Sequence, residues 1–239
     1  MLGSLLGGGD PRFAAISILL TIPTILIALS AHESAHGYIA YKLGDRTAFN
    51  LGRITLNPVK HIDPFGAICM LLFGYGWAKP VPINARNFKD PRKGMALTAL
   101  AGPVTNLILG TIGVILYYLT LYIANTNAVM DMVYTNYTAH VAVTMILVFL
   151  ENFALVNFLY TVFNLIPVPP FDGSRIFSVV LPTKIYFNIM KYERYYLIAI
   201  LGVSFICSRL FNFSPFAWLA DKLFYLIGYP FVLLFNLIF

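Results

Sequence analysis

The sequence predicts an all-α polytopic membrane protein, because of its composition and the way its charges are distributed. Hydrophobic residues make up 59% of the 239 residues, charged residues 11%, and the mean hydropathy is +0.77, far above the range of water-soluble globular proteins. Charge-free runs of bilayer-crossing length recur along the chain, and no polar or flexible linker divides it. We therefore expect one membrane-embedded domain over residues 1–239, with about five transmembrane helices and a short membrane-associated β-hairpin.

The first transmembrane helix is expected over residues 13–31, which carry no charge. At about 1.5 Å per residue, a helix of this length covers a large part of the roughly 30 Å hydrocarbon core of a bilayer. Residues 1–10 contain no Lys or Arg, and the apolar run after them does not end in a small-residue cleavage site. We therefore expect this run to be retained and not removed as a signal peptide.

Three ionisable residues, His32, Glu33 and His36, lie at the far end of this run. Histidines four positions apart share one face of a helix and can bind Zn²⁺ through their imidazole nitrogens. Glu33 can reach a metal-bound water as general base, so the spacing predicts metal-assisted hydrolysis. Such a short pattern also occurs by chance, although ionisable side chains at the rim of an apolar segment are costly and are usually excluded.

Residues 40–93 form a basic segment around a short apolar patch at residues 66–77. The patch is too short to cross a bilayer, and it contains Gly74 and Gly76, with two prolines shortly after its end. This pattern favours a re-entrant or interfacial β-hairpin. The patch is then either a packing loop or an extended edge that binds an unwound polypeptide by strand addition.

A second transmembrane helix is expected over residues 94–123. Within it, Gly102 permits the close approach of another helix, and Asn106 places a polar amide inside the membrane. Asn106 either joins helices by hydrogen bonds or belongs to a functional site. Residues 124–139 contain no Lys or Arg and are expected to form an external loop.

The third transmembrane helix is expected over residues 140 to about 166, with Glu151 as its one deep charge. A hydrogen-bonded structural role for Glu151 is favoured over a functional one. Three prolines between residues 167 and 170 end this helix, and Asp172 and Gly173 follow them. Irregular backbone at this depth must be buried in protein or line a water-filled cavity.

Two further transmembrane helices are expected over residues 195–213 and 223–239. Thirteen of the 16 Lys and Arg residues lie in residues 40–93 and 173–194. Because positively charged loops stay on the cytoplasmic side, we expect these two segments in the cytoplasm and the N-terminus outside the cell membrane. The same pattern explains the basic residues by membrane orientation and argues against nucleic-acid binding.

A catalytic zinc site needs a third protein ligand besides His32 and His36. The candidate donors are His61, Cys69, His140, Glu151, Asp172 and Cys207. By the predicted topology, Asp172 returns to the membrane depth of the two histidines, as do His61 and Cys69. Asp172 is favoured because a proline-stiffened turn holds it, although an Asp-Gly pair is also typical of a turn or a helix N-cap. The two cysteines lie far apart in apolar surroundings and are expected to be free thiols.

Two motifs of the chain resemble those of the site-2 protease family of intramembrane zinc metalloproteases. The first is His-Glu-x-x-His at residues 32–36, and the second is Asn-x-x-Pro-x-x-x-x-Asp-Gly at residues 164–173. Residues 52–66 and 101–106 also resemble segments of this family. The resemblance therefore covers most of the chain, and two paired motifs in the same order are far more specific than either motif alone.

The family resemblance implies a role for each motif residue. It makes His32, His36 and Asp172 the ligands of one zinc ion. Glu33 is then the catalytic base, and Asn164 is a polar partner of the substrate or of the tetrahedral intermediate. The apolar patch corresponds to a membrane-inserted β-hairpin, and the partners are the lipid bilayer and single-span membrane protein substrates. Many relatives carry a PDZ or CBS domain, and the absence of a matching stretch here predicts a minimal form of the family.

The sequence therefore predicts an intramembrane zinc metalloprotease that hydrolyses peptide bonds in or near transmembrane segments, with its active site toward the cytoplasm. One alternative is a metal-ion transporter, because histidines and carboxylates in membrane spans also mark ion pathways. A transporter is expected to have polar residues along a path across the membrane, whereas here they cluster at one depth. The other alternative is a non-proteolytic scaffold or chaperone, which would not need Glu33.

Overall fold

The computed structural model describes residues 11–66 and 78–238, and its regular structure there is helical. The β pairing in these residues is limited to one antiparallel bridge between Ile62 and Ala78. Three described helices are long and apolar enough to cross a membrane: α5 (Pro91–Ala124), α7 (Tyr137–Asn164) and α11 (Pro215–Ile238). The prediction of a helical membrane protein is thus confirmed. The expected hairpin falls almost entirely on residues 67–77, outside the described residues.

The first expected span lies within α2 (Pro11–Lys42), a single helix of 32 residues. This helix does not end with the apolar run at residue 31, and it continues through the His-Glu-x-x-His motif. Because the helix is continuous there, His32 and His36 are one turn apart, as their spacing predicts.

Two of the three membrane-crossing candidates, α5 and α7, begin at side-chain caps. Asp90 accepts hydrogen bonds from two backbone N–H groups in the first turn of α5, which starts with Pro91. Asn136 does the same for α7. These caps pair N–H groups that have no partner inside the helix. Both helices therefore begin slightly before the apolar runs from which they were predicted.

The remaining helices connect these long ones, and some of them were not expected. Residues 124–139, predicted as a loop, contain α6 (Asn127–Thr135). The fourth expected span corresponds to α10 (Glu193–Leu210), which is not among the three membrane-crossing candidates in the described chain. The other short elements are α3 (Thr47–Asn50), η1 (Pro58–Lys60), η2 (Ala85–Asn87), α8 (Asp172–Phe177) and α9 (Thr183–Lys191).

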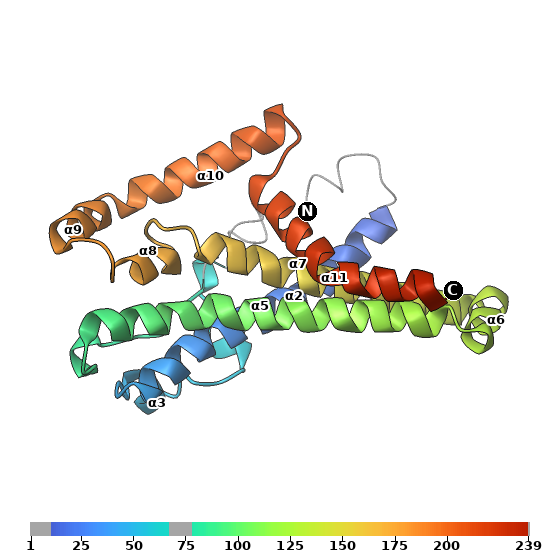
Figure 1. The fold of residues 1–239 in the computed structure, drawn as a ribbon, viewed down its shortest axis with the longest axis horizontal. Coiled ribbons are helices and arrows are strands. Elements are labelled where there is room, and N and C mark those ends of the chain that lie inside the picture. The colour runs from blue at the N-terminus through green and yellow to red at the C-terminus, as the bar shows by residue number, and fades with distance from the viewer. Residues whose placement is uncertain (1–10, 67–77, 239) are drawn as a thin grey trace.

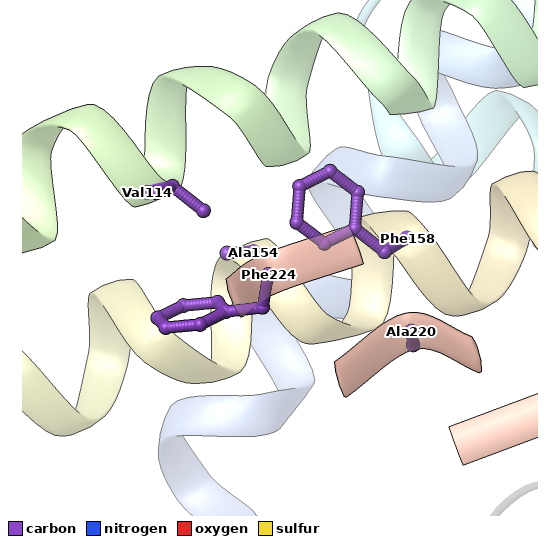
Figure 2. Close-up of a cluster of buried hydrophobic side chains, with 5 residues drawn as sticks. All are labelled: Val114, Ala154, Phe158, Ala220 and Phe224. Atoms are coloured by element: carbon purple, nitrogen blue, oxygen red, sulfur yellow. The ribbon is translucent and has the colours of Figure 1, made fainter. Parts of the chain in front are cut away.

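The core of the fold is an antiparallel pair of helices, α5 and α7, with α2 and α11 packed against both (Figure 1). Figure 2 shows a cluster of buried apolar side chains where α5, α7 and α11 meet. The cluster consists of Val114, Ala154, Phe158, Ala220 and Phe224. Gly110 of α5 lies directly against the ring of Phe158, where a Cβ atom would overlap it. Small residues at such positions let membrane helices pack closely.

Several short helices lie at one end of this bundle. α3, α8, α9 and the start of α5 lie at one end of the molecule, whereas α6 lies at the opposite end and α10 stands apart from the bundle (Figure 1). α8 packs against α5, and α5 packs against α2. This arrangement brings α8 close to the part of α2 that carries the histidine motif.

Candidate metal centre

The three predicted metal ligands meet at one point beside α5. Nε2 of His32 and Nε2 of His36 each lie 3.1 Å from Oδ2 of Asp172, and the donor atoms all lie within 4.8 Å of one another. Both histidines are buried, and Asp172 is partly buried. In a tetrahedral zinc site with bonds of about 2.0–2.1 Å, neighbouring ligand atoms are about 3.3 Å apart. The spacing of these side chains therefore fits a zinc ion.

Hydrogen bonds around Asn106 fix the tautomer of His32. Nδ2 of Asn106 donates to Ala28 O at 3.1 Å and to Asn157 Oδ1 at 2.9 Å. The amide oxygen is thus the atom that faces Nδ1 of His32, at 2.5 Å. Because an amide oxygen only accepts, Nδ1 carries the proton and donates it. In the neutral imidazole, Nε2 then presents its lone pair toward Asp172.

His36 is oriented in the same way by the backbone of α5. Its Nδ1 lies 2.7 Å from the carbonyl oxygen of Thr98, which accepts the Nδ1 proton. Two imidazole lone pairs and a carboxylate oxygen of Asp172 therefore converge on one point. Three acceptors this close repel one another unless a proton or a metal ion lies between them. Ring N–H groups bound to an amide or a carbonyl are also the usual support for metal-binding histidines.

Asn106 is part of a buried amide pair that joins three helices. Asn106 and Asn157 are both fully buried. Asn157 accepts from Asn106 and donates its own Nδ2 to Phe153 O at 2.8 Å. Both interpretations of Asn106 therefore hold, since it links helices and also orients a site histidine. Asn157 was not anticipated, although an asparagine inside an apolar helix was a usable signal.

Gly102 creates the space for the two histidine rings. A Cβ atom at this position would lie 2.5 Å from Nε2 of His32 and 2.6 Å from Cε1 of His36. Any side chain here would therefore overlap the edges of both rings that face Asp172. The close approach predicted for Gly102 is thus an approach of the α5 backbone to the site itself.

Asp172 is the first residue of α8 and is held by the turn that follows α7. Gly173 packs against the carbonyl groups of Leu165 and Ile166, at the end of α7, with no room for a Cβ atom. The backbone of α8 is therefore in direct contact with the end of α7. Asp172 was predicted as a ligand, a turn residue or a helix cap, and it begins a helix with its carboxylate on the histidines.

Glu33 lies next to His32, and its carboxylate is bound by a backbone group from outside α2. Oε2 of Glu33 accepts a hydrogen bond from the N–H of Val81 at 2.8 Å. Val81 belongs to the extended segment that leads from residue 78 toward η2. This contact was not predicted, because the residue type does not indicate which backbone N–H group will bind a carboxylate.

Asn164, the other predicted catalytic residue, is the last residue of α7. Its Nδ2 donates to Tyr160 O at 3.0 Å within the same helix. No hydrogen bond joins Asn164 to the three ligand side chains in the described residues. Tyr160 lies near the site, with its ring centroid 6.5 Å from that of His32.

The other candidate ligands lie apart from the cluster. His61 is buried elsewhere and donates from Nε2 to Thr55 O at 2.8 Å. His140 and Glu151 are exposed on α7, and Cys207 is a free thiol on α10. Glu151 has no hydrogen bond or ion pair with the described residues, so the hydrogen-bonded role expected for it has no partner there. Cys69 lies outside the described residues.

The chain is similar in sequence to known proteins. The model of peptidase family M50 matches residues 20–206. Two proteins named "Putative zinc metalloprotease" are similar to this chain. YwhC of Bacillus subtilis (strain 168) is 40% identical over 178 residues, which cover 74% of this chain and 76% of YwhC. Rip2 of Mycobacterium tuberculosis is 29% identical over 170 residues, which cover 69% of this chain and 58% of Rip2. No solved structure matches the chain.

Proposed function

This chain belongs to peptidase family M50, and on that premise we propose that His32, His36 and Asp172 bind its zinc ion and that Glu33 is the general base. The chain is an intramembrane zinc metalloprotease. The observation that carries the residue assignment is the convergence of two imidazole lone pairs and one carboxylate oxygen on a single point. A two-histidine, one-carboxylate set leaves a fourth position open, as a catalytic zinc site requires.

Glu33 is proposed to move the protons of the reaction. When bound, zinc supplies Lewis acidity that acidifies a water molecule and polarises the scissile carbonyl group. The carboxylate of Glu33 accepts a proton from the attacking water and returns it to the departing amide nitrogen. The new C–O bond forms first, and the peptide C–N bond then breaks as the amine departs with the proton from Glu33, so one water is consumed for each bond cleaved.

Asn164 is proposed to stabilise the negative charge that develops on the substrate oxygen. Its amide group now donates to a carbonyl of its own helix. A change of rotamer would direct the same Nδ2 group toward a substrate carbonyl. A donor that faces a developing oxyanion stabilises the transition state more than the ground state.

The substrates are membrane proteins, and we propose that single-span proteins are cut in or near their transmembrane segments. Peptide bonds inside a helix are shielded by its hydrogen bonds, so the substrate has to unwind first. The apolar patch at residues 66–77 is proposed to form the hairpin that pairs with the unwound strand. The antiparallel bridge between Ile62 and Ala78, on either side of this patch, supports a hairpin.

The chain is proposed to form one domain over residues 1–239 that crosses the cell membrane five times. The additional spans would be α2, with its charge-free residues 13–31, and α10. Basic residues are concentrated in residues 40–93 and 173–194. This distribution supports a cytoplasmic position for the metal centre and an external N-terminus.

Cleavage by the purified protein in liposomes tests these assignments. The assay follows a single-span test protein with and without a chelator, together with the zinc content per chain. Glu33→Gln should retain zinc and lose cleavage, whereas Asp172→Asn should lose zinc. Asp221→Asn, an exposed acid on α11, is the matched control and should resemble the wild type. Cleavage by Glu33→Gln, or full zinc occupancy in Asp172→Asn, would contradict the corresponding role.

A further inference from the structure

Arg53 is a buried cation that forms no ion pair in the described part of the chain. Its side chain is 8% exposed. Nη2 of Arg53 donates to the carbonyl oxygen of Lys79 at 2.7 Å and to that of Pro80 at 3.3 Å. Its Nε is buried without a hydrogen-bond partner among the described residues. Burying a guanidinium without a counter-ion is costly. The two carbonyl groups that Arg53 contacts therefore indicate its role.

The two ends of one peptide group connect Arg53 to the proposed general base. The carbonyl of Pro80 and the N–H of Val81 belong to the same planar peptide unit. Arg53 donates to the oxygen of this unit, and Glu33 Oε2 accepts from its nitrogen at 2.8 Å. The stronger contact with Lys79 O holds the preceding peptide unit. The orientation of the Pro80–Val81 peptide is therefore fixed from both sides.

Side-chain packing on α2 fixes the same segment. Gly37 lies one helical turn after Glu33, on the same face. A Cβ atom at Gly37 would lie 3.3 Å from Cγ1 of Val81 and 3.1 Å from Cγ1 of Ile54. Val81 and Ile54, the residue after Arg53, therefore both pack against the α2 backbone at Gly37. The absence of a side chain at Gly37 lets both segments approach the helix this closely.

We propose that Arg53 is a positioning residue for proteolysis. It holds the Pro80–Val81 peptide group so that the Val81 N–H stays on Oε2 of Glu33 and fixes the orientation of the general base. This inference rests on the proposed function, in which Glu33 is that base. With Oε2 bound, Oε1 is the oxygen that is free to receive a proton. A misplacement of about 1 Å in such a group costs on the order of 100-fold in rate.

Substitution of Arg53 tests this role by two independent measurements. Arg53→Met removes the donors and keeps a long side chain. We expect the Val81 amide to exchange its hydrogen about tenfold faster or more, measured by exchange mass spectrometry or NMR on zinc-loaded protein. We expect kcat to fall about tenfold or more, KM to stay within about twofold, and the zinc content to be unchanged. Arg53→Lys should recover part of both effects, since it restores a donor.

Two further variants make the result specific. Arg46→Met changes an exposed arginine at the start of α3 and should leave exchange and kcat unchanged. Val81→Pro removes the N–H group while Arg53 stays in place, and it should lower kcat with zinc retained. If Arg53→Met does not fold, the kcat of Val81→Pro still tests whether the Val81 N–H group supports catalysis.

An unchanged Val81 exchange rate or an unchanged kcat in Arg53→Met, or an unchanged kcat in Val81→Pro, would overturn the proposal. Cleavage by Glu33→Gln would instead refute the base assignment and with it the catalytic role of Arg53. In that case faster Val81 exchange in Arg53→Met would still show that Arg53 holds the segment. The failure of the proposed function is therefore distinguishable from the failure of this inference.

Discussion

Asn106 lies in a membrane helix, where an unpaired amide would be costly, yet its oxygen and its nitrogen are both hydrogen-bonded within the protein. One of these bonds fixes the proton of His32 on Nδ1. A single residue therefore sets the tautomer of a proposed metal ligand. The backbone carbonyl of Thr98 likewise fixes the proton of His36 on Nδ1. The position of this carbonyl depends on the path of the α5 backbone and not on the Thr98 side chain.

Asn106→Ala should weaken zinc binding. The variant leaves Nδ1 of His32 without its acceptor, and loss of such a partner costs about 10- to 100-fold in metal affinity. Competition with a chelator of known affinity measures the change. Asn152→Ala, on α7, removes an amide that donates to its own helix at Val148 O, and it should bind zinc like the wild type. Equal zinc affinity in both variants would contradict the role of Asn106.

Gly102→Ala should displace the metal-binding edges of the histidines. The added methyl group would lie 2.5 Å from Nε2 of His32, so the ring or the α5 backbone has to shift. We expect zinc occupancy and cleavage to be lost together, as followed by metal analysis of the purified protein. Gly202→Ala on α10 is the control, because in the described part of the chain no atom outside its own helix backbone lies within 4 Å of the added carbon. Normal occupancy in Gly102→Ala would show that the site tolerates a wider helix spacing.

At the scale of whole elements, α5 supports both the site and the bundle. Its Gly102 lies against the histidines, and its Gly110 and Gly113 lie against α7. Lipid surrounds these helices, so association depends on contact between surfaces more than on exclusion of water. Close packing along α5 therefore stabilises the same helix pair that carries the Asn106–Asn157 amide contact.

Phe158→Ala should destabilise the α5–α7–α11 contact. Phe158 is fully buried in the cluster of Figure 2. Its loss leaves a cavity, and we expect a cost of roughly 1–3 kcal/mol, below the value of water-soluble cores because the transfer from water is absent. Thermal unfolding in detergent measures this change. Phe205→Ala on α10, where the ring is 54% exposed, should unfold at the wild-type temperature.

Asp45 joins the loop after α2 to the segment before α5. Its fully buried carboxylate accepts hydrogen bonds from Thr47 N, Asn84 N and Asn87 Nδ2. Burial by itself would raise the pKa of this carboxyl group, but the hydrogen bonds outweigh burial and hold the pKa below its usual 3.8. The ionised form is therefore the one that the fold stabilises.

Asp45→Asn should reduce stability in a pH-dependent way. Because the folded pKa is lowered, the contribution of Asp45 is present above about pH 3.8 and is lost as the pH falls through the folded pKa. The difference in unfolding temperature between wild type and variant should be largest near pH 7 and should shrink below about pH 4. The measurement uses zinc-free protein, so that metal release does not contribute. Asp131→Asn, an exposed acid on α6, should show no such difference.

For the molecule as a whole, the helices were predictable where a long apolar run stands between clear end signals. Asp90 with Pro91 begins α5 and Asn136 begins α7, so these helices start close to the predicted positions. α6 was missed because its residues include no Lys or Arg and lie between two apolar runs, a pattern that was interpreted as an external loop. α11 starts at Pro215 and not at residue 223, because Asp221 and Lys222 interrupt the apolar pattern without ending the helix.

Of the groups that form the site, only the side chains could be predicted from the sequence. Helix periodicity places His32 and His36 together, and the family resemblance adds Asp172. The Thr98 carbonyl and the Val81 N–H were not predictable, because every residue carries a backbone carbonyl and every residue except proline carries a backbone N–H. The pairing of Asn106 with Asn157 depends on how two helices pack, which a single sequence does not specify.

Removal of zinc should loosen the folded molecule. A ligand that binds only the folded state stabilises it by about 2.7 kcal/mol at 100 times its Kd. We therefore expect a chelator to lower the unfolding temperature of the wild type, and added zinc to restore it. The Asp172→Asn variant should respond to neither. An unfolding temperature of the wild type that is independent of zinc would contradict a metal held by these residues.

The order of the ligands along the chain also has a consequence for biosynthesis. His32 and Asp172 are 140 positions apart, and α5 and α7 are made between them. A nascent chain that ends before α8 contains both histidines and Glu33 but not Asp172, the proposed third ligand. On the proposed ligand set, the metal centre is therefore incomplete, and no cleavage is expected, until α8 has been synthesised and has packed against α5.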